Sequence, residues 1–232
     1  MKTNFRKIDA DWLLAKNMCR STVNKDFSDV EPSSEFITNL LISEHSPIRL
    51  VNVVWSWEDI YSWVATHWSR HKFEKYISTQ RDDRVEDKHV FDDFDPVWVD
   101  EKGNEHHPYK TRNDAPQGAL VRFNGYANAQ NLIDAFRKRL CYQASPETRV
   151  LAEDFKVTLH ESQKELANVL VPNCVYRCGC PEFKPCGYFK GYVDWYTEGE
   201  YGVSGNSLLL NIKDRYEAYN EYFYATHRYV EE

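Results

Sequence analysis

The sequence is poor in glycine and has none of the glycine-rich motifs that bind phosphate groups. Only 9 of its 232 residues are glycine, and neither GxxxxGK[ST] nor GxGxxG occurs. The GxSxG turn of the α/β-hydrolases and the HExxH helix of zinc peptidases are also missing. These absences exclude a P-loop nucleotide site, a Rossmann dinucleotide site, a serine hydrolase of the α/β-hydrolase type and a zinc peptidase of the HExxH type. An anion site in this chain would have to be built from arginine side chains and helix N-termini.

The sequence also lacks a long hydrophobic run and an excess of positive charge. No apolar stretch approaches the roughly 18 residues of a membrane-spanning helix, and the segment MKTNFRKIDADW contains no signal-peptide core. Asp and Glu number 36 against 29 Lys and Arg, a net charge of −7, which disfavours general binding to nucleic acids or anionic membranes. We therefore expect a soluble, intracellular protein with no membrane and no nucleic-acid partner.

Six cysteines are present, and most of them crowd into one segment. The segment CVYRCGCPEFKPC, near residues 174–186, contains Cys174, Cys178, Cys180 and Cys186. Their spacing is not the paired CxxC of structural zinc sites, and no histidine follows at a ligand interval. We expect free thiols in a turn region and no bound metal. A zinc site in this Cys-rich segment stays open as the alternative.

The length of 232 residues indicates one domain that spans residues 1–232, and residue patterns predict both a strand and helices within it. The β-branched run LVNVVW predicts a strand at 50–55, and the helix after it is expected to carry His67 on its inward face. Ten acidic against three basic residues between 82 and 105 predict a solvated acidic excursion near 82–110. The predicted helices cover residues 33–43, 57–70, 128–144, 146–169 and 206–227. Ser33 and Ser145 are expected to cap the first and the fourth of these helices, and Ser56 with Asp59 resembles the N-terminus of the second.

The stretch HWSRHKFEKYISTQRDDR, residues 67–84, concentrates basic and hydrogen-bonding side chains in an otherwise acidic chain. Arg70, His71 and Lys72 stand at the predicted end of a helix, and hydroxyl, amide and guanidinium groups follow at 78–81. Arginine binds phosphate bidentately, whereas amides and hydroxyls recognise the edge of a planar ring. The stretch therefore indicates a site for a phosphorylated planar ligand. The alternative is a surface turn whose charges pair with nearby acidic residues.

A second block, NAQNLIDAFRKRLCYQASPETR, begins at Asn128 and combines an apolar helical stripe with Arg139 and Glu147. The two blocks together resemble the flavin-dependent thymidylate synthases (ThyX), most closely the divergent phage-type members. The order EHSPIR, HWSRHK and STQR resembles the family's Arg-His-Arg triplet and Ser-x-Arg element. The second block resembles the family's Asn-Ala-Arg-x-Leu helix, with matching intervals from Asn128 to Arg139 and to Glu147. The resemblance covers roughly residues 15–150.

The resemblance implies a fold, an assembly and a reaction. The fold is α+β, with a small, mostly antiparallel sheet packed against long helices, in homotetramers with shared sites. The reaction is methylation of dUMP at C5, with methylenetetrahydrofolate as carbon donor, reduced FAD as hydride source and NADPH as cosubstrate. The enzyme is expected in the cytoplasm, that of the host cell if a phage encodes it. Two alternatives stay open: a related pyrimidine-nucleotide hydroxymethylase, or a non-enzymatic, zinc-stabilised binding module.

The resemblance also implies roles for individual residues. Arg139 and His71 are expected to be catalytic, with Arg139 reaching a carbonyl of uracil. The residues implied in dUMP binding are His67, Ser78, Thr79, Gln80, Arg81 and Arg139. Those implied in FAD binding are Arg70, His71, Lys72, Ser46 and Asn128, with Ser21 or Thr22 as an earlier flavin contact.

Three positions depart from the family pattern. Lys72 stands third in the Arg-His-Arg triplet, so a point charge replaces a planar guanidinium. Gln130 replaces the arginine two residues after the helix asparagine, and Asn168 replaces the arginine of a Leu-Pro-Tyr stretch. The candidate substitutes for that last arginine are Arg112, Arg122 and Arg177.

Overall fold

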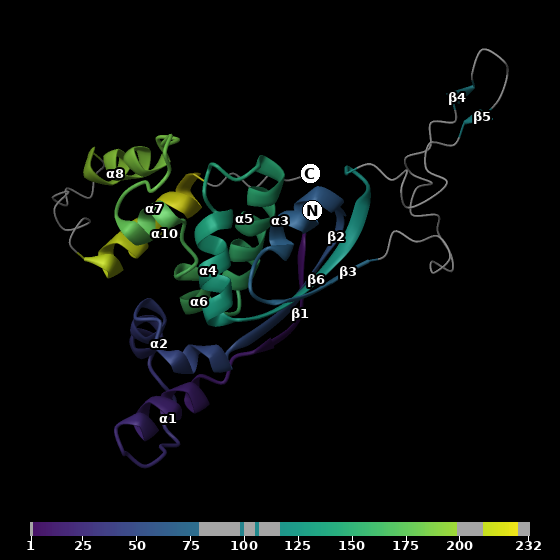
Figure 1. Ribbon diagram of the computed structural model, residues 1–232. Coiled ribbons are helices and arrows are strands. Elements are labelled where there is room, and N and C mark those ends of the chain that lie inside the picture. The colour runs from purple at the N-terminus through teal and green to yellow at the C-terminus, as the bar shows by residue number, and fades with distance from the viewer. Residues whose placement is uncertain (1, 79–97, 100–104, 107–116, 199–210, 227–232) are drawn as a thin grey trace.

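A computed structural model describes residues 2–78, 98–99, 105–106, 117–198 and 211–226. Figure 1 shows a curved sheet beside a group of central helices, with α7, α8 and α10 on the other side of that group and α1 and α2 below it. The strands are β1 Thr3–Asp9, β2 Asn52–Tyr61, β3 Glu74–Ile77, β4 Trp98–Val99, β5 Glu105–His106 and β6 Leu120–Asn128. The helices are α1 Trp12–Thr22, α2 Ser34–Ile42, the 3₁₀ helix η1 Ser46–Leu50, α3 Ser62–Ser69, α4 Ala129–Arg139, α5 Pro146–His160, α6 Lys164–Asn168, α7 Asn173–Arg177, α8 Tyr188–Glu198 and α10 Ile212–Thr226.

Four strands form one antiparallel sheet in the order β1-β2-β6-β3. Side chains of β6 alternate between buried and more exposed positions, as expected for a strand with one face on the core. Because Glu74 of β3 pairs with Tyr126 of β6, the residues just before β3 lie beside the start of α4. The predicted α+β class and the small antiparallel sheet are confirmed.

The buried face of the sheet is built from large aromatic side chains. Trp55 and Trp57 are fully buried, with ring centroids 5.6 Å apart in a T-shaped arrangement. Trp55 lies opposite Gly125 in the register of β2 and β6, and a Cβ at Gly125 would come within 2.2 Å of the Trp55 ring. Position 125 therefore has room only for glycine. Phe155 of α5 packs on this layer, with its ring centroid 5.2 Å from that of Trp55.

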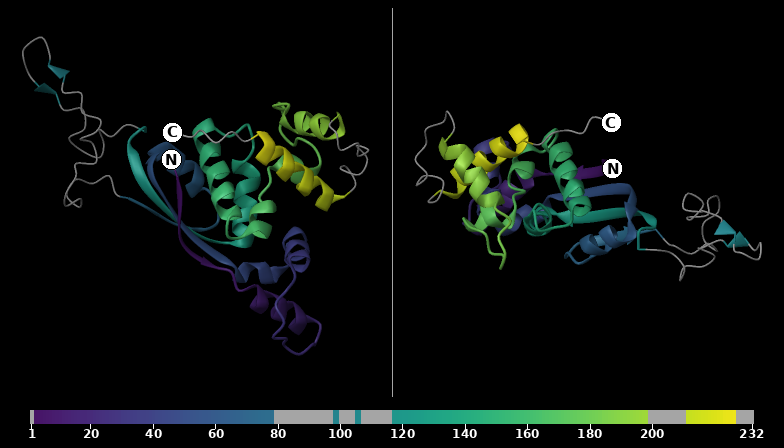
Figure 2. Two further views of the ribbon diagram at one scale, coloured as in Figure 1. Left: turned by 180° about the vertical axis from the view of Figure 1, so that it is seen from behind. Right: turned by 90° about the horizontal axis from the view of Figure 1, so that it is seen from above.

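Helices α3, α4 and α5 cover this face of the sheet (Figures 1 and 2). Helix α4 begins directly after β6, where the side chain of Asn128 caps it by accepting a hydrogen bond from Asn131 N at 2.9 Å. Trp68 of α3 and Phe136 of α4 are in contact, with ring centroids 5.5 Å apart. This contact holds the C-terminal ends of α3 and α4 close together.

The helix predicted at 57–70 begins later than expected, at Ser62. Residues 57–61 continue β2, because Trp57 and Ile60 are both buried and both pair with β6. A bulge between these two residues, with Asp59 at a φ of 55°, bends the strand before α3 starts. The prediction was wrong here because buried side chains at 57, 60 and 64 fit a helical period as well as a bulged strand.

The inner face of α3 also differs from the expected one. Val64, Ala65 and Trp68 are its buried residues, whereas His67 is only partly buried. The buried face of α3 is therefore centred on Val64, Ala65 and Trp68 and not on the predicted face, so His67 lies at the edge of the core. A side chain in that position can reach both the protein interior and a ligand.

Two further helices end earlier than predicted. The helix predicted at 128–144 ends at Arg139, and residues 140–145 form a turn before Pro146 begins α5. The helix predicted at 146–169 stops at His160, where the carbonyl of Leu159 accepts hydrogen bonds from Ser162 N and Gln163 N. The chain then restarts as α6. Pro146 at the first position of α5 and the hydrogen bonds to Leu159 O at its end set these boundaries locally. The spacing of hydrophobic residues gives no information about either of them.

The other predicted helices are present. Helix 33–43 is α2, and its predicted cap Ser33 accepts a hydrogen bond from Phe36 N at 3.2 Å. The helix predicted at 206–227 corresponds to α10, with residues 206–210 and 227 outside the described part of the chain. Most of the acidic excursion predicted near 82–110 also lies outside it; the described pieces there are the paired strands β4 and β5.

Lys156 of α5 is fully buried and links three helices. Its Nζ donates to Ala167 O of α6 and to Asn220 Oδ1 of α10, both at 2.7 Å. The rings of Tyr219 and Phe223 lie 5.5 and 5.4 Å from the same nitrogen. Burial lowers the pKa of this amine well below its usual value. Lys156 thus joins α10 to α5 and α6, with no carboxylate partner among the described residues.

The Cys-rich segment forms α7 and the loop at 178–187. Helix α7 ends at Cys178, which adopts the left-handed conformation with a φ of 55°. All six cysteines of the chain are free thiols. Among the residues that the structure describes, no three His, Cys, Asp or Glu side chains are placed to hold a metal ion. The described helices also include none that is long and apolar enough to span a bilayer.

Candidate active site

Four of the predicted site residues meet at the ends of α3 and α4. His67 lies in the last turn of α3, Arg70 is the C-cap of that helix, and His71 follows it. Arg139 is the last residue of α4. We refer to His67, Arg70, His71 and Arg139 as the cationic cluster. Its members come from two segments that the aromatic layer brings together.

Arg139 binds directly to His71 and to α3. Its Nε donates to Nε2 of His71 at 2.7 Å, and its Nη2 donates to the backbone oxygen of His67 at 2.6 Å. Because Nε2 of His71 accepts, the neutral ring carries its proton on Nδ1. In the described part of the chain Nη1 of Arg139 has no hydrogen-bond partner. The guanidinium is therefore oriented along one edge and open to a ligand at Nη1.

The electrostatics of the cluster favour an anion. Burial, together with the charges of Arg139 and Lys75, lowers the pKa of His71 to about 4, so the ring is neutral at pH 7. Burial and the charge of Arg70 lower the pKa of Arg139. The pKa of His67 is lowered by burial and by the charges of Arg139 and Arg70. No described carboxylate lies within ion-pair distance of Arg70 or Arg139, so within that part of the chain their positive charge has no counterion.

Two hydroxyl groups support His67. Its Nδ1 lies 3.0 Å from Oγ1 of Thr148, and Ser145 Oγ lies 2.8 Å from the same oxygen. Thr148 is fully buried in the first turn of α5. The turn that ends α4 therefore also positions these hydroxyls. Sequence reasoning missed Thr148, and the one available signal was its place three residues after the predicted cap at Ser145.

A groove of about 450 Å³ lies between the residues that follow α3 and the start of α4. Lys72, Asn128 and Asn131 are among the residues that line it. The oxygen of the Asn128 side chain caps α4, which leaves its amide N–H groups free to donate. The groove therefore offers ammonium and amide donors to a ligand, beside the carboxylate of Glu74. The structure thus brings Lys72 and Asn128, both predicted for FAD binding, to one place.

Two further predicted residues that the structure describes, Ser46 and Ser78, make no hydrogen bond to the cluster. Ser46 is exposed at the start of η1 and is not among the residues that line the groove. Ser78 follows β3, where its N donates to Arg122 O and its Oγ accepts from Arg122 N, both at 2.9 Å. Thr79, Gln80 and Arg81 lie outside the described residues. Their role in binding a nucleotide phosphate stays a prediction.

No protein-family model and no curated protein matches the sequence. Solved structures do match. A flavin-dependent thymidylate synthase, ThyX from Helicobacter pylori complexed with FAD and dUMP, has a TM-score of 0.56 and 16% identity, over 74% of this chain and 100% of that chain. The UMP/dUMP methylase PolB from Streptomyces cacaoi, bound with 5-Br dUMP, has a TM-score of 0.52 and 14% identity, over 72% and 93%. The chain has the ThyX fold.

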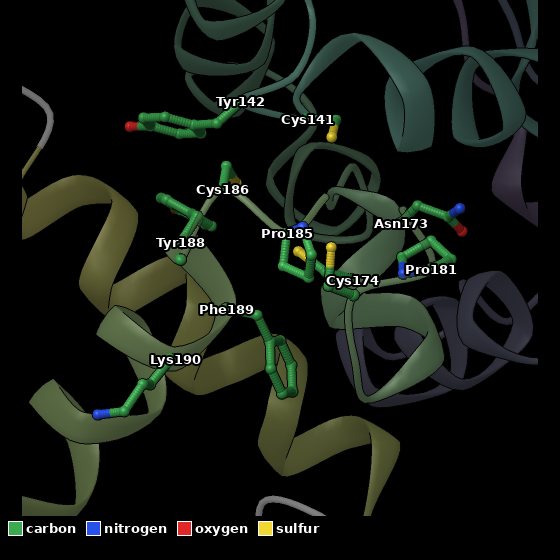
Figure 3. Close-up of a pocket in the computed structure, with 12 residues that line it drawn as sticks. Cys141, Tyr142, Asn173, Cys174, Pro181, Pro185, Cys186, Tyr188, Phe189 and Lys190 are labelled. Atoms are coloured by element: carbon green, nitrogen blue, oxygen red, sulfur yellow. The ribbon is translucent and has the colours of Figure 1, made fainter. Parts of the chain in front are cut away.

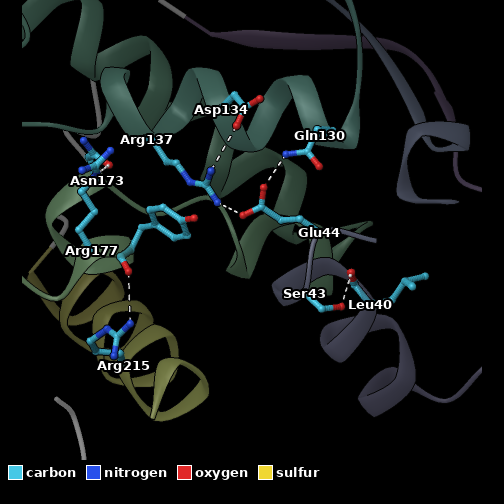
Figure 4. A network of polar contacts seen from close by, with 10 residues as sticks. Leu40, Ser43, Glu44, Gln130, Asp134, Arg137, Asn173, Arg177 and Arg215 are labelled. Carbon is cyan, nitrogen blue, oxygen red and sulfur yellow. Dashed lines mark hydrogen bonds and ion pairs between the residues drawn. The ribbon is translucent and has the colours of Figure 1, made fainter. Parts of the chain in front are cut away.

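Within this ThyX fold, Gln130 takes part in an internal network (Figure 4). Its Nε2 donates to Oε2 of Glu44 at 2.6 Å, and Arg137 binds the other oxygen of Glu44. Arg137 also lies 3.2 Å from Asp134 and stacks 3.6 Å above the ring of Tyr176. Burial opposes the charge of Arg137, but the hydrogen bond and ion pair with Glu44 leave its pKa above the usual value. Gln130 therefore ties α4 to the segment after α2, and sequence reasoning identified neither Glu44 nor Arg137.

Two of the three candidate substitutes for the missing family arginine lie in the described part of the ThyX fold. Arg122 is exposed on β6, 3.5 Å from Glu58. Arg177 is exposed on α7, where its Nε donates to Asn173 Oδ1 at 3.2 Å. Neither makes a hydrogen bond to the cationic cluster in the described residues, and Arg112 lies outside them. Substitution of the family arginine by one of these three residues stays a prediction.

Proposed function

We propose that this chain is a flavin-dependent enzyme that methylates dUMP at C5. Methylenetetrahydrofolate donates the carbon, FAD is the cofactor and NADPH is the reductant. The observation that carries the proposal is the contact between Arg139 and the neutral ring of His71, in a cluster with no described carboxylate. The ThyX fold supports it, because the matching Helicobacter pylori enzyme was crystallised with FAD and dUMP.

Arg139 is suited to activate the pyrimidine ring. Uracil becomes more nucleophilic at C5 when negative charge accumulates on its N3–carbonyl system. Arg139 offers Nη1 to that charge, while His71 and the backbone oxygen of His67 fix the orientation of the guanidinium. Because His71 is neutral, it leaves the full charge of Arg139 available. A preorganised donor of this kind contributes about 3 kcal/mol to stabilising a transition state.

The groove and the residues beside it are suited to hold the cofactor. FAD, when bound, supplies the hydride that completes the methyl group. Lys72 and Asn128 line the groove, and Arg70 and His71 precede Lys72 in the chain, so donors for phosphates and ring edges are adjacent. In the same proposal Ser46 contacts the flavin, and residues 78–81 together with His67 bind the nucleotide.

The test is release of tritium from dUMP labelled at C5, in the presence of FAD, NADPH and methylenetetrahydrofolate. The parent protein is expected to release tritium and to form dTMP, with FAD absorbance retained after gel filtration. Arg139→Ala should lower turnover roughly 100-fold or more, and Arg139→Lys should not restore it, because an ammonium cannot reproduce the planar fork.

Arg6→Ala is the matched control, because Arg6 is an exposed arginine that pairs with Glu58 on β2, apart from the cluster. It should behave as the parent. Normal tritium release by Arg139→Ala would contradict the proposal. Chromatography of the product separates a methylated from a hydroxymethylated pyrimidine, and a hydroxymethyl product would replace the methylation step of the proposal.

A further inference from the structure

Four cysteines from two separate segments surround one small cavity (Figure 3). Cys141 follows α4, whereas Cys174, Cys180 and Cys186 belong to α7 and to the loop before α8. The cavity has a volume of about 150 Å³, and its other lining residues are mainly proline and aromatic. Sequence reasoning grouped the last three cysteines with Cys178 but did not connect Cys141 with them. The fold brings Cys141 to the same cavity as the three cysteines of the other segment.

The segments that carry Cys141 and Cys186 are docked on each other. Gln143 Nε2 donates to Lys184 O at 2.7 Å, and the rings of Tyr142 and Tyr188 stack with centroids 4.2 Å apart. Each of the two cysteines lies within two residues of both contacts. The turn at 140–145 and the loop at 178–187 are therefore held with a thiol on each side of their interface.

The thiols around the cavity differ in accessibility and reactivity. Cys186 is exposed, Cys141 is half-buried, and Cys174 is buried. Burial raises the pKa of Cys141, and it raises that of Cys174 to about 12. Because Cys186 is the exposed thiol of this group, it is the one that a reagent from solvent reaches first. A hydrogen bond from the backbone of Gln143 favours the ionised form of Cys141, which suits that residue to a second step.

We propose that Cys141 and Cys186 form a dithiol site that low-molecular-weight disulfides oxidise to an intramolecular disulfide. The Cys186 thiolate attacks one sulfur of the reagent, whose S–S bond breaks, and the leaving thiolate takes up the proton that Cys186 lost. Cys141 then loses its proton, attacks Sγ of Cys186 and displaces the second half of the reagent as a thiol. Two cysteines are oxidised by two electrons, and one reagent disulfide is reduced to two thiols.

The proposed disulfide would connect two segments of the fold, one of which follows the cationic cluster. Gly187 follows Cys186 with a φ of +86°, a left-handed conformation that favours glycine, so the loop turns directly after the reactive thiol. Cys141 lies two residues after Arg139. The disulfide therefore fastens the turn that follows the cationic cluster to the loop before α8. In a reducing compartment such a bond is transient and responds to the thiol–disulfide balance.

The experiment treats the folded full-length chain with oxidised glutathione and follows intact mass and thiol count. The parent should lose two of its six thiols without retaining glutathione, and digestion without reduction should join the peptides of Cys141 and Cys186. Cys141→Ser should retain one glutathione on Cys186, whereas Cys186→Ser should retain none and form no such disulfide. Cys19→Ser is the matched control, because Cys19 lies on α1 and is not among the residues lining the cavity.

Three results would overturn the proposal. One is no loss of thiols in the parent, which requires no variant to fold. Another is a disulfide that maps to Cys174 or Cys180 in place of Cys141. The last is a glutathione adduct that stays on the parent as it does on Cys141→Ser. Mass and thiol count are independent of the substrate proposed above, so failure of one proposal leaves the other standing.

Discussion

The neutral imidazole of His71 determines how Arg139 can act. Its Nε2 accepts the hydrogen bond from Arg139 Nε, and an imidazolium would have a donor at that position and a positive charge beside the guanidinium. Protonation of His71 would therefore break the contact that orients Arg139. The orientation of Arg139 is therefore lost at acidic pH, at the depressed pKa of His71.

We predict that the free energy of unfolding falls as the pH is lowered from about 6.5 towards 4. The pKa of His71 is lowered to about 4 from its usual 6.5, so the folded protein binds fewer protons than the unfolded chain in this window. The stabilisation is complete above the unfolded pKa and is lost as the pH falls through the folded one. Urea unfolding across this range measures it. His71→Asn, which keeps an acceptor but does not titrate, should flatten the dependence, and an unchanged slope would contradict the assignment.

At the scale of elements, Glu44 joins α4 to the segment after α2. It sits in the left-handed region with a φ of 53° and accepts hydrogen bonds from both Gln130 and Arg137. The side chain of Arg137 is 12% exposed, so removal of Glu44 leaves this buried charge with only the more exposed Asp134 as an ion-pair partner. We predict that Glu44→Ala lowers the free energy of unfolding by about 2–4 kcal/mol.

The matched control is Glu58→Ala. Glu58 forms more exposed ion pairs with Arg6 and Arg122, which should be worth roughly 0–1 kcal/mol. Denaturant unfolding of both variants measures the difference. Equal, small losses for the two variants would show that the Glu44 network does not stabilise the fold.

The pairing of β2 with β6 depends on one glycine. We predict that Gly125→Ala lowers the free energy of unfolding by about 3 kcal/mol, because the new Cβ would come within 2.2 Å of the fully buried ring of Trp55. Gly118→Ala is the control, since a Cβ at position 118 meets nothing within 4 Å. Thermal unfolding followed by the near-ultraviolet signal of tryptophan checks both. Equal stability of the two variants would mean that the Trp55 layer can shift.

The elements show how far the sequence allows prediction. The cap at Ser33, the helix start at Asn128 and the helix start at Ser145–Pro146 follow from local chemistry, and the structure has all three. Residues 57–61 were predicted as helix because Ser56 and Asp59 resemble a helix N-terminus and the apolar residues from Ile60 onward fit a helical period. Only the pairing with β6 shows that these residues continue β2. That pairing is a long-range contact, which local patterns do not encode.

The same distinction applies to the site. Arg139 and His71 could be predicted from two motifs, and the structure joins them. Thr148, Glu44 and the proximity of Cys141 to Cys186 could not, because each depends on segments that meet only in the folded chain.

For the whole molecule, we predict assembly through exposed apolar side chains near α1. Phe27 and Val30, in the segment after α1, are 62% and 68% exposed, and Val23 in the same region is 62% exposed. Figure 1 shows α1 apart from the helices that cover the sheet. We predict a homotetramer in sedimentation at micromolar concentration, and Phe27→Asp should shift it to smaller species. Lys25→Glu, a charge change in the same segment, is the control, and a monomeric parent would contradict the assembly.

Hydrogen exchange at the buried amine of Lys156 reports the motion of α10. Its hydrogens are enclosed by Ala167 O, Asn220 Oδ1 and the rings of α10, so they reach water only when that helix lifts away. An exposed lysine amine exchanges its hydrogens rapidly, whereas here exchange waits for the opening of a helix. The exchange rate of this single side chain therefore reports how often α10 detaches, with no label added to the protein.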